Sequence, residues 1–148
     1  MKEFNILVVG NNPIDLSGIF QRLEEMVDQK FSTRAAFDWE SIENRISTFK
    51  PHYVLIDDNI GREELEKTVI ALSRHRKTKN APITVIKNSN YQSLVSSGIM
   101  DYILKDHSTG ENLYRSFLNS IKFRKTQILL ARAYHRRKRK IMDLMTQS

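Results

Sequence analysis

Short apolar runs alternate along the chain with segments whose apolar side chains recur every three or four residues. The runs predict strands, and the run at 53–56 predicts a strand buried on both faces. The predicted strands are residues 4–9, 31–37, 53–56, 82–86 and 100–104. The predicted helices are residues 13–29, 39–49, 62–76 and 91–97, and a last helix from residues 108–109 to the end of the chain. Five strands alternating with five helices predict an α/β fold with a doubly wound parallel sheet.

Capping and turn residues mark the boundaries of these segments. Asn12 can cap the first helix, and Pro13 suits its first position. Asp38 can cap the second helix, and Gly98 ends the short helix before the last strand. Pro51 introduces the central strand, which then ends in two carboxylates. The boundaries therefore agree with the apolar pattern.

Asp57 and Asp58 come at the carboxyl end of the central strand. In open α/β sheets this edge is where ligands bind, because the loops that follow the strands meet there. Lys87 and Lys105 directly follow the fourth and fifth strands, so the topology brings them to the same edge. An aspartate after a strand is equally suited to forming a turn, and the two carboxylates alone do not decide between a site and a turn.

The order of elements and three sequence segments resemble the receiver domain of two-component response regulators, of the chemotaxis type. The segments are the opening strand Ile-Leu-Val-Val at 6–9, the central strand ending in Asp57, and the stretch Ser-Gly-Ile-Met-Asp-Tyr-Ile-Leu-Lys at 97–105. The resemblance covers about residues 4–122. It implies a flavodoxin-like fold with strand order 2-1-3-4-5.

The resemblance also implies roles for individual residues. Asp57 lies where the family has its phosphoacceptor aspartate, Lys105 where it has a lysine that contacts the acyl phosphate, and Tyr102 where it has an aromatic switch residue. In a working receiver, Mg²⁺ neutralises the charge between the aspartate and the incoming phosphoryl group. Asp57 and Asp58 are the metal ligands to expect if a metal binds.

The chain departs from the family pattern in positions that such a reaction needs. The acidic pair after the first strand is replaced by Gly10 and Asn11, with Asn12 beyond, so the metal positions are degenerate. Asp15 lies on the first helix, and we do not expect it to compensate. Lys87 occupies the position of the hydroxyl residue after the fourth strand. We predict that the Lys87 ammonium stands in for the missing metal and holds Asp57 in a structural ion pair.

The segment 87–98 is also about one helical turn shorter than the family pattern. We therefore interpret the chain as an atypical receiver that acts by protein–protein interaction without Mg²⁺-dependent phosphorylation. It is expected to be no enzyme and to need no cofactor. Its partners would be signalling proteins, either a histidine kinase or a downstream effector. The alternative is a phosphorylatable receiver that binds Mg²⁺ and accepts a phosphoryl group on Asp57.

The net charge of +7 is unevenly distributed along the 148 residues. Residues 1–111 carry 14 Lys and Arg against 16 Asp and Glu, a net charge of −2, whereas residues 112–148 carry 10 against one, a net charge of +9. The body is therefore nearly neutral, and the basic character belongs to the last helix. We divide the chain into a receiver domain, residues 1–122, and a basic helical extension, residues 123–148.

The extension carries an imperfect apolar seam that Lys138 interrupts. Its members are Ile128, Ala131, Tyr134 or His135, Ile141 or Met142, and Met145. Since a helix this long is not stable alone in water, the seam predicts a parallel coiled coil with a second copy, and hence a homodimer. The alternative interpretation is that the last helix connects to a further output domain.

Basic residues crowd the extension just before its end. They are Arg136, Arg137, Lys138, Arg139 and Lys140. A second alternative function is nucleic-acid binding through these residues. We rank it last, because no helix-turn-helix follows and no aromatic residues interleave the charges.

Other functional classes are disfavoured by what the sequence lacks. It has no cysteine, which excludes disulfides and thiolate metal sites, and no apolar run near the roughly 20 residues that cross a bilayer. The four histidines fall in different elements and suggest no metal cluster. No glycine-rich phosphate loop follows the first strand, which disfavours a dehydrogenase. A cytoplasmic protein without membrane insertion is expected.

Overall fold

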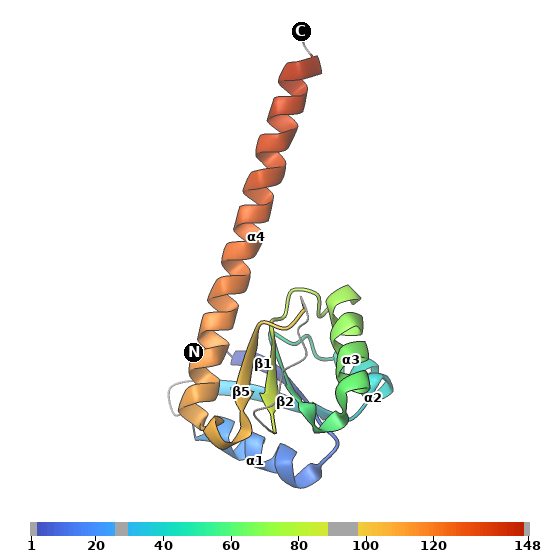
Figure 1. Ribbon diagram of the computed structural model, residues 1–148, viewed down its shortest axis with the longest axis vertical. Coiled ribbons are helices and arrows are strands. Elements are labelled where there is room, and N and C mark those ends of the chain that lie inside the picture. Colours follow the sequence, from blue (N-terminus) through green and yellow to red (C-terminus); the bar gives the residue numbers. More distant parts are fainter. Residues whose placement is uncertain (1–2, 26–29, 89–97, 147–148) are drawn as a thin grey trace.

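A computed structural model describes residues 3–25, 30–88 and 98–146 of the chain. Five parallel strands form one sheet in the order β2-β1-β3-β4-β5 (Figure 1). The strands are β1 (Glu3–Val9), β2 (Lys30–Ala36), β3 (Tyr53–Asp57), β4 (Ile83–Lys87) and β5 (Asp101–Leu104). The helices are α1 (Pro13–Glu24), α2 (Trp39–Ile46), α3 (Arg62–Arg74) and α4 (Gly110–Thr146), with short 3-10 turns η1 (Asp58–Ile60) and η2 (Lys105–His107). The predicted sheet, its strand order and the long last helix are confirmed.

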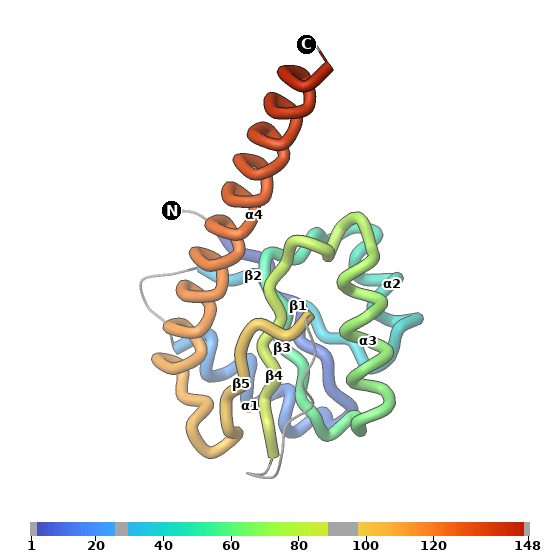
Figure 2. The backbone as a smooth tube through the Cα atoms, turned by 45° about the horizontal axis from the view of Figure 1, so that its top comes forward, coloured from blue at the N-terminus to red at the C-terminus, as the bar shows by residue number. Residues whose placement is uncertain are grey.

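The central strand β3 is buried along its whole length and supplies both faces of the core. Since side chains alternate across a strand, Val54 and Ile56 join the cluster under α2 and α3, whereas Tyr53 and Leu55 join the cluster under α1 and α4. Figure 2 shows these two helix pairs on opposite faces of the sheet. This arrangement leaves the carboxyl ends of the strands open between the two helical layers.

The predicted caps begin the helices as expected. The side chain of Asn12 accepts hydrogen bonds from the first backbone amides of α1, and Pro13 occupies the first turn. Asp38 and Ser41 form a reciprocal capping box at the start of α2. Hydrogen bonds from the backbone and side chain of Ser41 lower the pKa of Asp38.

Two of the predicted helices are longer than the helices in the structure. Helix α1 ends at Glu24 and α2 at Ile46, earlier than the predicted residues 29 and 49. The helix predicted at 91–97 lies outside the described residues. Gly98 approaches α3 so closely that an added Cβ would lie 2.7 Å from Val69 Cγ1 and from Ser73 Oγ. Glycine is therefore needed here for close packing, in addition to any role in ending a helix.

Helix α4 has 37 residues, about 55 Å at 1.5 Å per residue, and only its beginning packs on the body. Leu113 and Phe117 are buried in the core, and Ile121 packs against it. Ile128 is the last partly buried residue, and all of residues 129–146 are exposed. Figure 1 shows this second half projecting away from the sheet.

A buried chain of hydroxyl groups joins β3, β4 and α4. The Tyr53 hydroxyl donates to Thr84 and lies 3.2 Å from Ser116 Oγ, which donates to Asp101 Oδ2 at 2.7 Å. Burial of its ring raises the pKa of Tyr53 to about 12. Thr84 is thus a buried polar residue of the core with hydrogen-bond partners.

Tyr53→Phe should lower the stability at neutral pH by about 1 kcal/mol, because two hydroxyls lose a buried partner. In the wild type, the unfolded tyrosine ionises near its ordinary pKa of 10.0 while the folded one stays neutral to about 12. The stability contributed by this neutral phenol is therefore complete below pH 10 and is lost as the pH rises from 10 to 12. Urea unfolding across this window should show a smaller alkaline loss in Tyr53→Phe. Tyr134→Phe, which removes an exposed phenol, is the matched control, and an equal loss in Tyr53→Phe would contradict the assignment.

Candidate functional site

Side chains from three strand ends and one helix meet at the carboxyl edge of the sheet. Asp57 ends β3, Asn88 follows β4 and Lys105 follows β5, while Asp15 reaches the same place from the first turn of α1. The parallel arrangement brings the strand ends together, and the packing of α1 on the core brings Asp15 to them. The structure thus brings Asp57 and Lys105, which were predicted to lie at this edge, together with Asp15 and Asn88, for which no role in the site was predicted.

Asp57 is almost completely buried, with 1% of its surface exposed. Its Oδ1 accepts hydrogen bonds from the backbone amide of Asn59 at 3.0 Å and from Asn88 Nδ2 at 2.7 Å. Its Oδ2 accepts no hydrogen bond from the described residues but lies 3.8 Å from Lys105 Nζ. A carboxylate buried to this degree needs such partners to remain charged.

Lys105 bridges two carboxylates. Its Nζ lies 2.6 Å from Asp15 Oδ2 and 3.8 Å from Asp57 Oδ2, and it donates to Asn88 Oδ1 at 3.2 Å. Asp15 Oδ2 also accepts a hydrogen bond from Asn59 Nδ2 at 3.2 Å. One ammonium, two side-chain amides and one backbone amide therefore stabilise the carboxylates of Asp15 and Asp57. Asp15, which we did not expect to compensate for the missing acidic pair, thus lies at the site as an ion-pair partner of Lys105.

Asn88 was missed by the sequence reasoning and makes the most contacts at this edge. Its Nδ2 donates to both Asp57 Oδ1 and Asp58 Oδ1, and its backbone amide donates to Asp58 Oδ1 at 3.1 Å. Asp58 begins η1, so it also forms the turn that its position suggested. The signal that could have identified Asn88 is its place as the first polar residue after a strand buried along most of its length.

Gly10 and Asn11, which replace the acidic pair after β1, provide space and a hydrogen-bond donor in place of carboxylates. Gly10 is buried, and an added Cβ would lie 3.0 Å from Leu16 Cδ2 and 3.5 Å from Asp57 Cβ. The Asn11 amide donates to the backbone oxygen of Asn59 at 3.2 Å. The glycine therefore provides space for α1 and for Asp57, and the asparagine adds another donor to the site.

Asn12 and Lys87 were also predicted to lie in the site. Asn12 has another role, and the role of Lys87 is not tested. Asn12 caps α1 with its side chain. Lys87 ends β4 and is partly buried. The ion pair that the structure shows for Asp57 comes from Lys105. The role predicted for Lys87, an ammonium in place of a metal, therefore stays a prediction.

Tyr102 lies in β5, partly buried against the core cluster under α2 and α3. Burial raises its pKa. The backbone amide of Tyr102 donates to Asp101 Oδ1 at 2.8 Å. Its ring is thus held on the side of the sheet opposite α4, and the switch role implied by the resemblance remains a prediction.

The donors in this site do not fit a magnesium ion. Mg²⁺ requires oxygen ligands in a near-octahedral arrangement, with one or two carboxylates among them. Here Lys105, Asn88 and Asn11 donate to the oxygens that a cation would use. Within the described ranges, no three His, Cys, Asp or Glu side chains are placed to share a metal. The carboxylates are already compensated by the protein.

The basic residues of the tail are fully separated from this edge. All five residues from Arg136 to Lys140 are exposed on the projecting half of α4. No helix in the described part of the chain is long and apolar enough to span a membrane.

No protein-family model and no curated protein matches the chain. Among solved structures it is similar to a sensor protein from Polaromonas sp. JS666, with a TM-score of 0.69 and 15% identity over 82% of this chain and 98% of that one. It is also similar to the receiver domain of a sensor histidine kinase from Pseudomonas aeruginosa PAO1, described with a magnesium ion coordinated in its active-site cleft. That match has a TM-score of 0.68 and 16% identity over 82% and 99% of the two chains. A fusion containing the trimeric coiled coil of the yeast protein Spc42 matches with a TM-score of 0.71 and 14% identity over 100% and 99%. The chain therefore has the fold of receiver domains.

Proposed function

We propose that this chain, which has the receiver fold, is an atypical receiver module of intracellular signalling that acts by binding other proteins, without Mg²⁺-dependent phosphorylation of Asp57. The observation that carries the proposal is the Lys105 ammonium, which lies 2.6 Å from Asp15 and 3.8 Å from Asp57. A cation of the protein itself therefore lies close to both carboxylates. In this proposal residues 1–122 form the receiver and residues 123–148 the interacting extension.

A Mg²⁺ titration followed by NMR tests this proposal. The backbone amides of Asp58, Asn59 and Asn88 report on the site, because all three residues contact Asp57 or one another there. We expect no saturable shift of these resonances up to millimolar Mg²⁺. A saturable shift at these amides would support the phosphorylatable alternative instead.

One observation favours that alternative. Asp57 Oδ2 accepts no hydrogen bond within the described residues, so one oxygen of the predicted phosphoacceptor is still available to an incoming group. Phosphorylation would require Lys105 to move from Asp15 towards that oxygen, because the ammonium is now closer to Asp15. We rank this function second.

We also propose that the projecting half of α4 pairs with α4 of a second copy in a parallel coiled coil. Residues 129–146 are exposed and include seven large apolar side chains. They are Leu129, Leu130, Tyr134, Ile141, Met142, Leu144 and Met145. A helix with this much exposed apolar surface needs a partner to persist in water. The match to the fusion that contains a trimeric coiled coil covers the whole chain, α4 included, and supports a coiled coil at α4 without supporting the number of chains in it.

Charged substitutions on the seam should dissociate the proposed dimer. Met142→Lys/Met145→Lys places ammonium groups at two adjacent seam positions, and sedimentation should then show monomers and reduced helicity. Leu144→Lys is the control. It adds one positive charge between those two positions, at a residue that is not part of the seam, and should leave the dimer intact. Because the tail carries like charges from Arg136 to Lys140, the wild-type dimer should tighten as salt is added. A wild type that remains monomeric with full helicity would contradict the proposal.

A further inference from the structure

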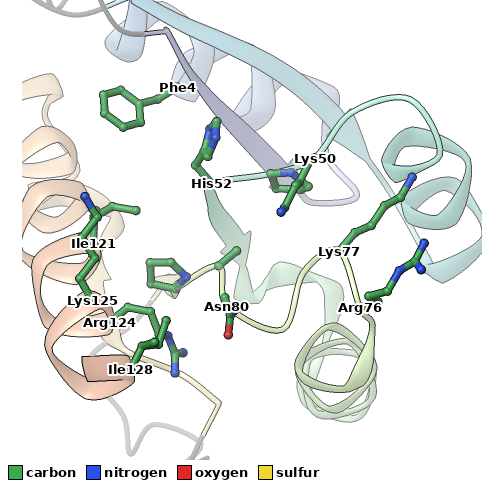
Figure 3. Close-up of a pocket in the computed structure, with 13 residues that line it drawn as sticks. Phe4, Lys50, His52, Arg76, Lys77, Asn80, Ile121, Arg124, Lys125 and Ile128 are labelled. Atoms are coloured by element: carbon green, nitrogen blue, oxygen red, sulfur yellow. The ribbon is translucent and has the colours of Figure 1, made fainter. Parts of the chain in front are cut away.

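A cavity of about 270 Å³ lies at the amino edge of the sheet, at the opposite end from the carboxylate site. It is bounded by α4 on one side and by the segments that lead into β3 and β4 on the other (Figure 3). Thirteen residues line it, and none is Asp or Glu. The basic lining residues are Lys50, Arg76, Lys77, Arg124 and Lys125, together with His52. In a body with a nearly neutral balance of charge, this concentration of cations favours an anionic ligand.

Arg124 lines this cavity and has a buried donor without an acceptor in the described part of the chain. Its Nη1 donates to Gln127 Oε1 at 3.3 Å, whereas its Nε is buried without a hydrogen-bond partner in the described part of the chain. Desolvation lowers the pKa of the guanidinium. A buried N–H without a partner costs free energy that a bound acceptor would recover.

The other basic side chains of the cavity differ in whether they already have hydrogen-bond partners within the protein. The Lys77 ammonium donates to the backbone oxygens of Ile46 at 2.9 Å and Ser47 at 3.1 Å, so it neutralises the end of α2. Figure 3 shows the Lys77 and Arg76 side chains extending away from α4, and Lys50 on the segment that leads into β3. Arg124 and Lys50 are therefore the pair from opposite walls that a ligand would engage.

Apolar side chains form the rest of the cavity wall. Phe4, Pro82, Ile121 and Ile128 line it together with the cations. A ligand that fills the space therefore needs both an anionic group and an apolar body. A guanidinium fork and an ammonium together match the several oxygens of a phosphate better than the two of a carboxylate.

We propose that this cavity binds a small phosphate monoester that carries an apolar ring. The phosphate contacts Arg124 and Lys50, and the ring packs between Phe4, Ile121 and Ile128. The volume lies just below the usual range of about 300–1000 Å³ for small-molecule sites, which limits the ligand to one ring.

The position of the cavity gives such a ligand a consequence for α4. Ile121, Arg124 and Ile128 are spaced along one face of the helix, and Ile128 is the last residue to touch the body before the helix projects. A ligand between this face and the segments before β3 and β4 would fix the direction in which the proposed dimerisation segment leaves the body. Binding is independent of the carboxylate site, so loss of the proposed receiver function would leave this inference standing.

Titration of the full chain with phenyl phosphate, followed by NMR, tests the proposal. The Arg124 Nε–H resonance and the amides of Lys50, His52 and Asn80 should shift together and saturate. Inorganic phosphate should bind at least about tenfold more weakly because it has no ring, and phenol should cause no saturable shift because it has no phosphate. Arg124→Gln should weaken phenyl phosphate binding about tenfold or more, while Arg132→Gln, an exposed arginine on the same helix beyond the cavity, should leave it unchanged.

Lys50→Gln provides a second variant on the opposite wall, should Arg124→Gln disturb the packing of α4 as judged by circular dichroism. It should weaken binding without changing the helical content. The proposal is overturned if the shifts do not saturate, if they are confined to the exposed residues 136–140, or if Arg132→Gln weakens binding as much as Arg124→Gln.

Discussion

Lys105→Met should lower the free energy of unfolding by about 3 kcal/mol, whereas Asp57→Asn should change it by less than about 1 kcal/mol. Methionine keeps the length of the side chain but leaves the buried Asp57 carboxylate, and Asp15 beside it, without their shared cation. Asparagine at position 57 removes the charge that needs compensation, and its Oδ1 can still accept from Asn59 and Asn88. Lys105 then keeps its closer partner, Asp15.

Chemical unfolding of the two single variants and the double variant measures this coupling. If the cation serves to compensate Asp57, Lys105→Met/Asp57→Asn should be more stable than Lys105→Met alone, because no buried charge is left unpaired at position 57. Lys67→Met is the matched control, since Lys67 forms an exposed ion pair with Glu63 on α3 and such pairs contribute little. Additive effects in the double variant would mean that Lys105 stabilises the fold in another way.

Asn11→Asp/Asn88→Ala should strengthen Mg²⁺ binding at the carboxyl edge of the sheet. The first substitution replaces an amide donor on the Asn59 carbonyl with a carboxylate, and the second removes the donor that covers Asp57 and Asp58. The edge then offers carboxylate and carbonyl oxygens of the kind that Mg²⁺ prefers. We expect a gain in Mg²⁺ affinity of about tenfold or more over the wild type, equivalent to about 1.4 kcal/mol.

The design leaves Gly10 unchanged, because a side chain there would press on Leu16. The control is Asn44→Asp/Asn119→Ala, which makes the same two changes at exposed positions of α2 and α4. An equal gain of Mg²⁺ affinity in the control would show a general effect of added negative charge. If neither variant binds Mg²⁺ better than the wild type, donors other than Asn11 and Asn88 must keep the metal out.

The fold was predictable because its elements are encoded locally. The β3 strand consists of consecutive buried residues that end at Asp57, and the caps at Asn12 and Asp38 begin α1 and α2 where expected. The carboxyl edge followed from the topology, since parallel strands must place Asp57 and Lys105 at the same side of the sheet. These features depend on short sequence stretches and on rules of chain connection.

The contacts inside the site were less predictable. Asp15 reaches Lys105 because the packing of Leu16 and Ile19 on the core fixes the angle of α1, and a sequence pattern does not specify that angle. Asn88 Nδ2 donates a hydrogen bond to Asp57, and this contact depends on how the Asn88 side chain is oriented after β4. The prediction had assigned a partner of Asp57 to the preceding residue, Lys87. The unpartnered Nε of Arg124 likewise depends on how α4 crosses the amino edge of the sheet.

The proposal that Asp57 is not phosphorylated is tested most directly by incubating the full chain with Mg²⁺ and a small phosphodonor such as acetyl phosphate. Intact mass then shows whether a phosphoryl group has been added. We expect no phosphoryl adduct, because Lys105, Asn88 and Asn11 already engage oxygens that the metal ion needed for the transfer would use. An adduct that forms in the wild type and disappears in Asp57→Asn would contradict it and would make this chain a phosphorylatable receiver.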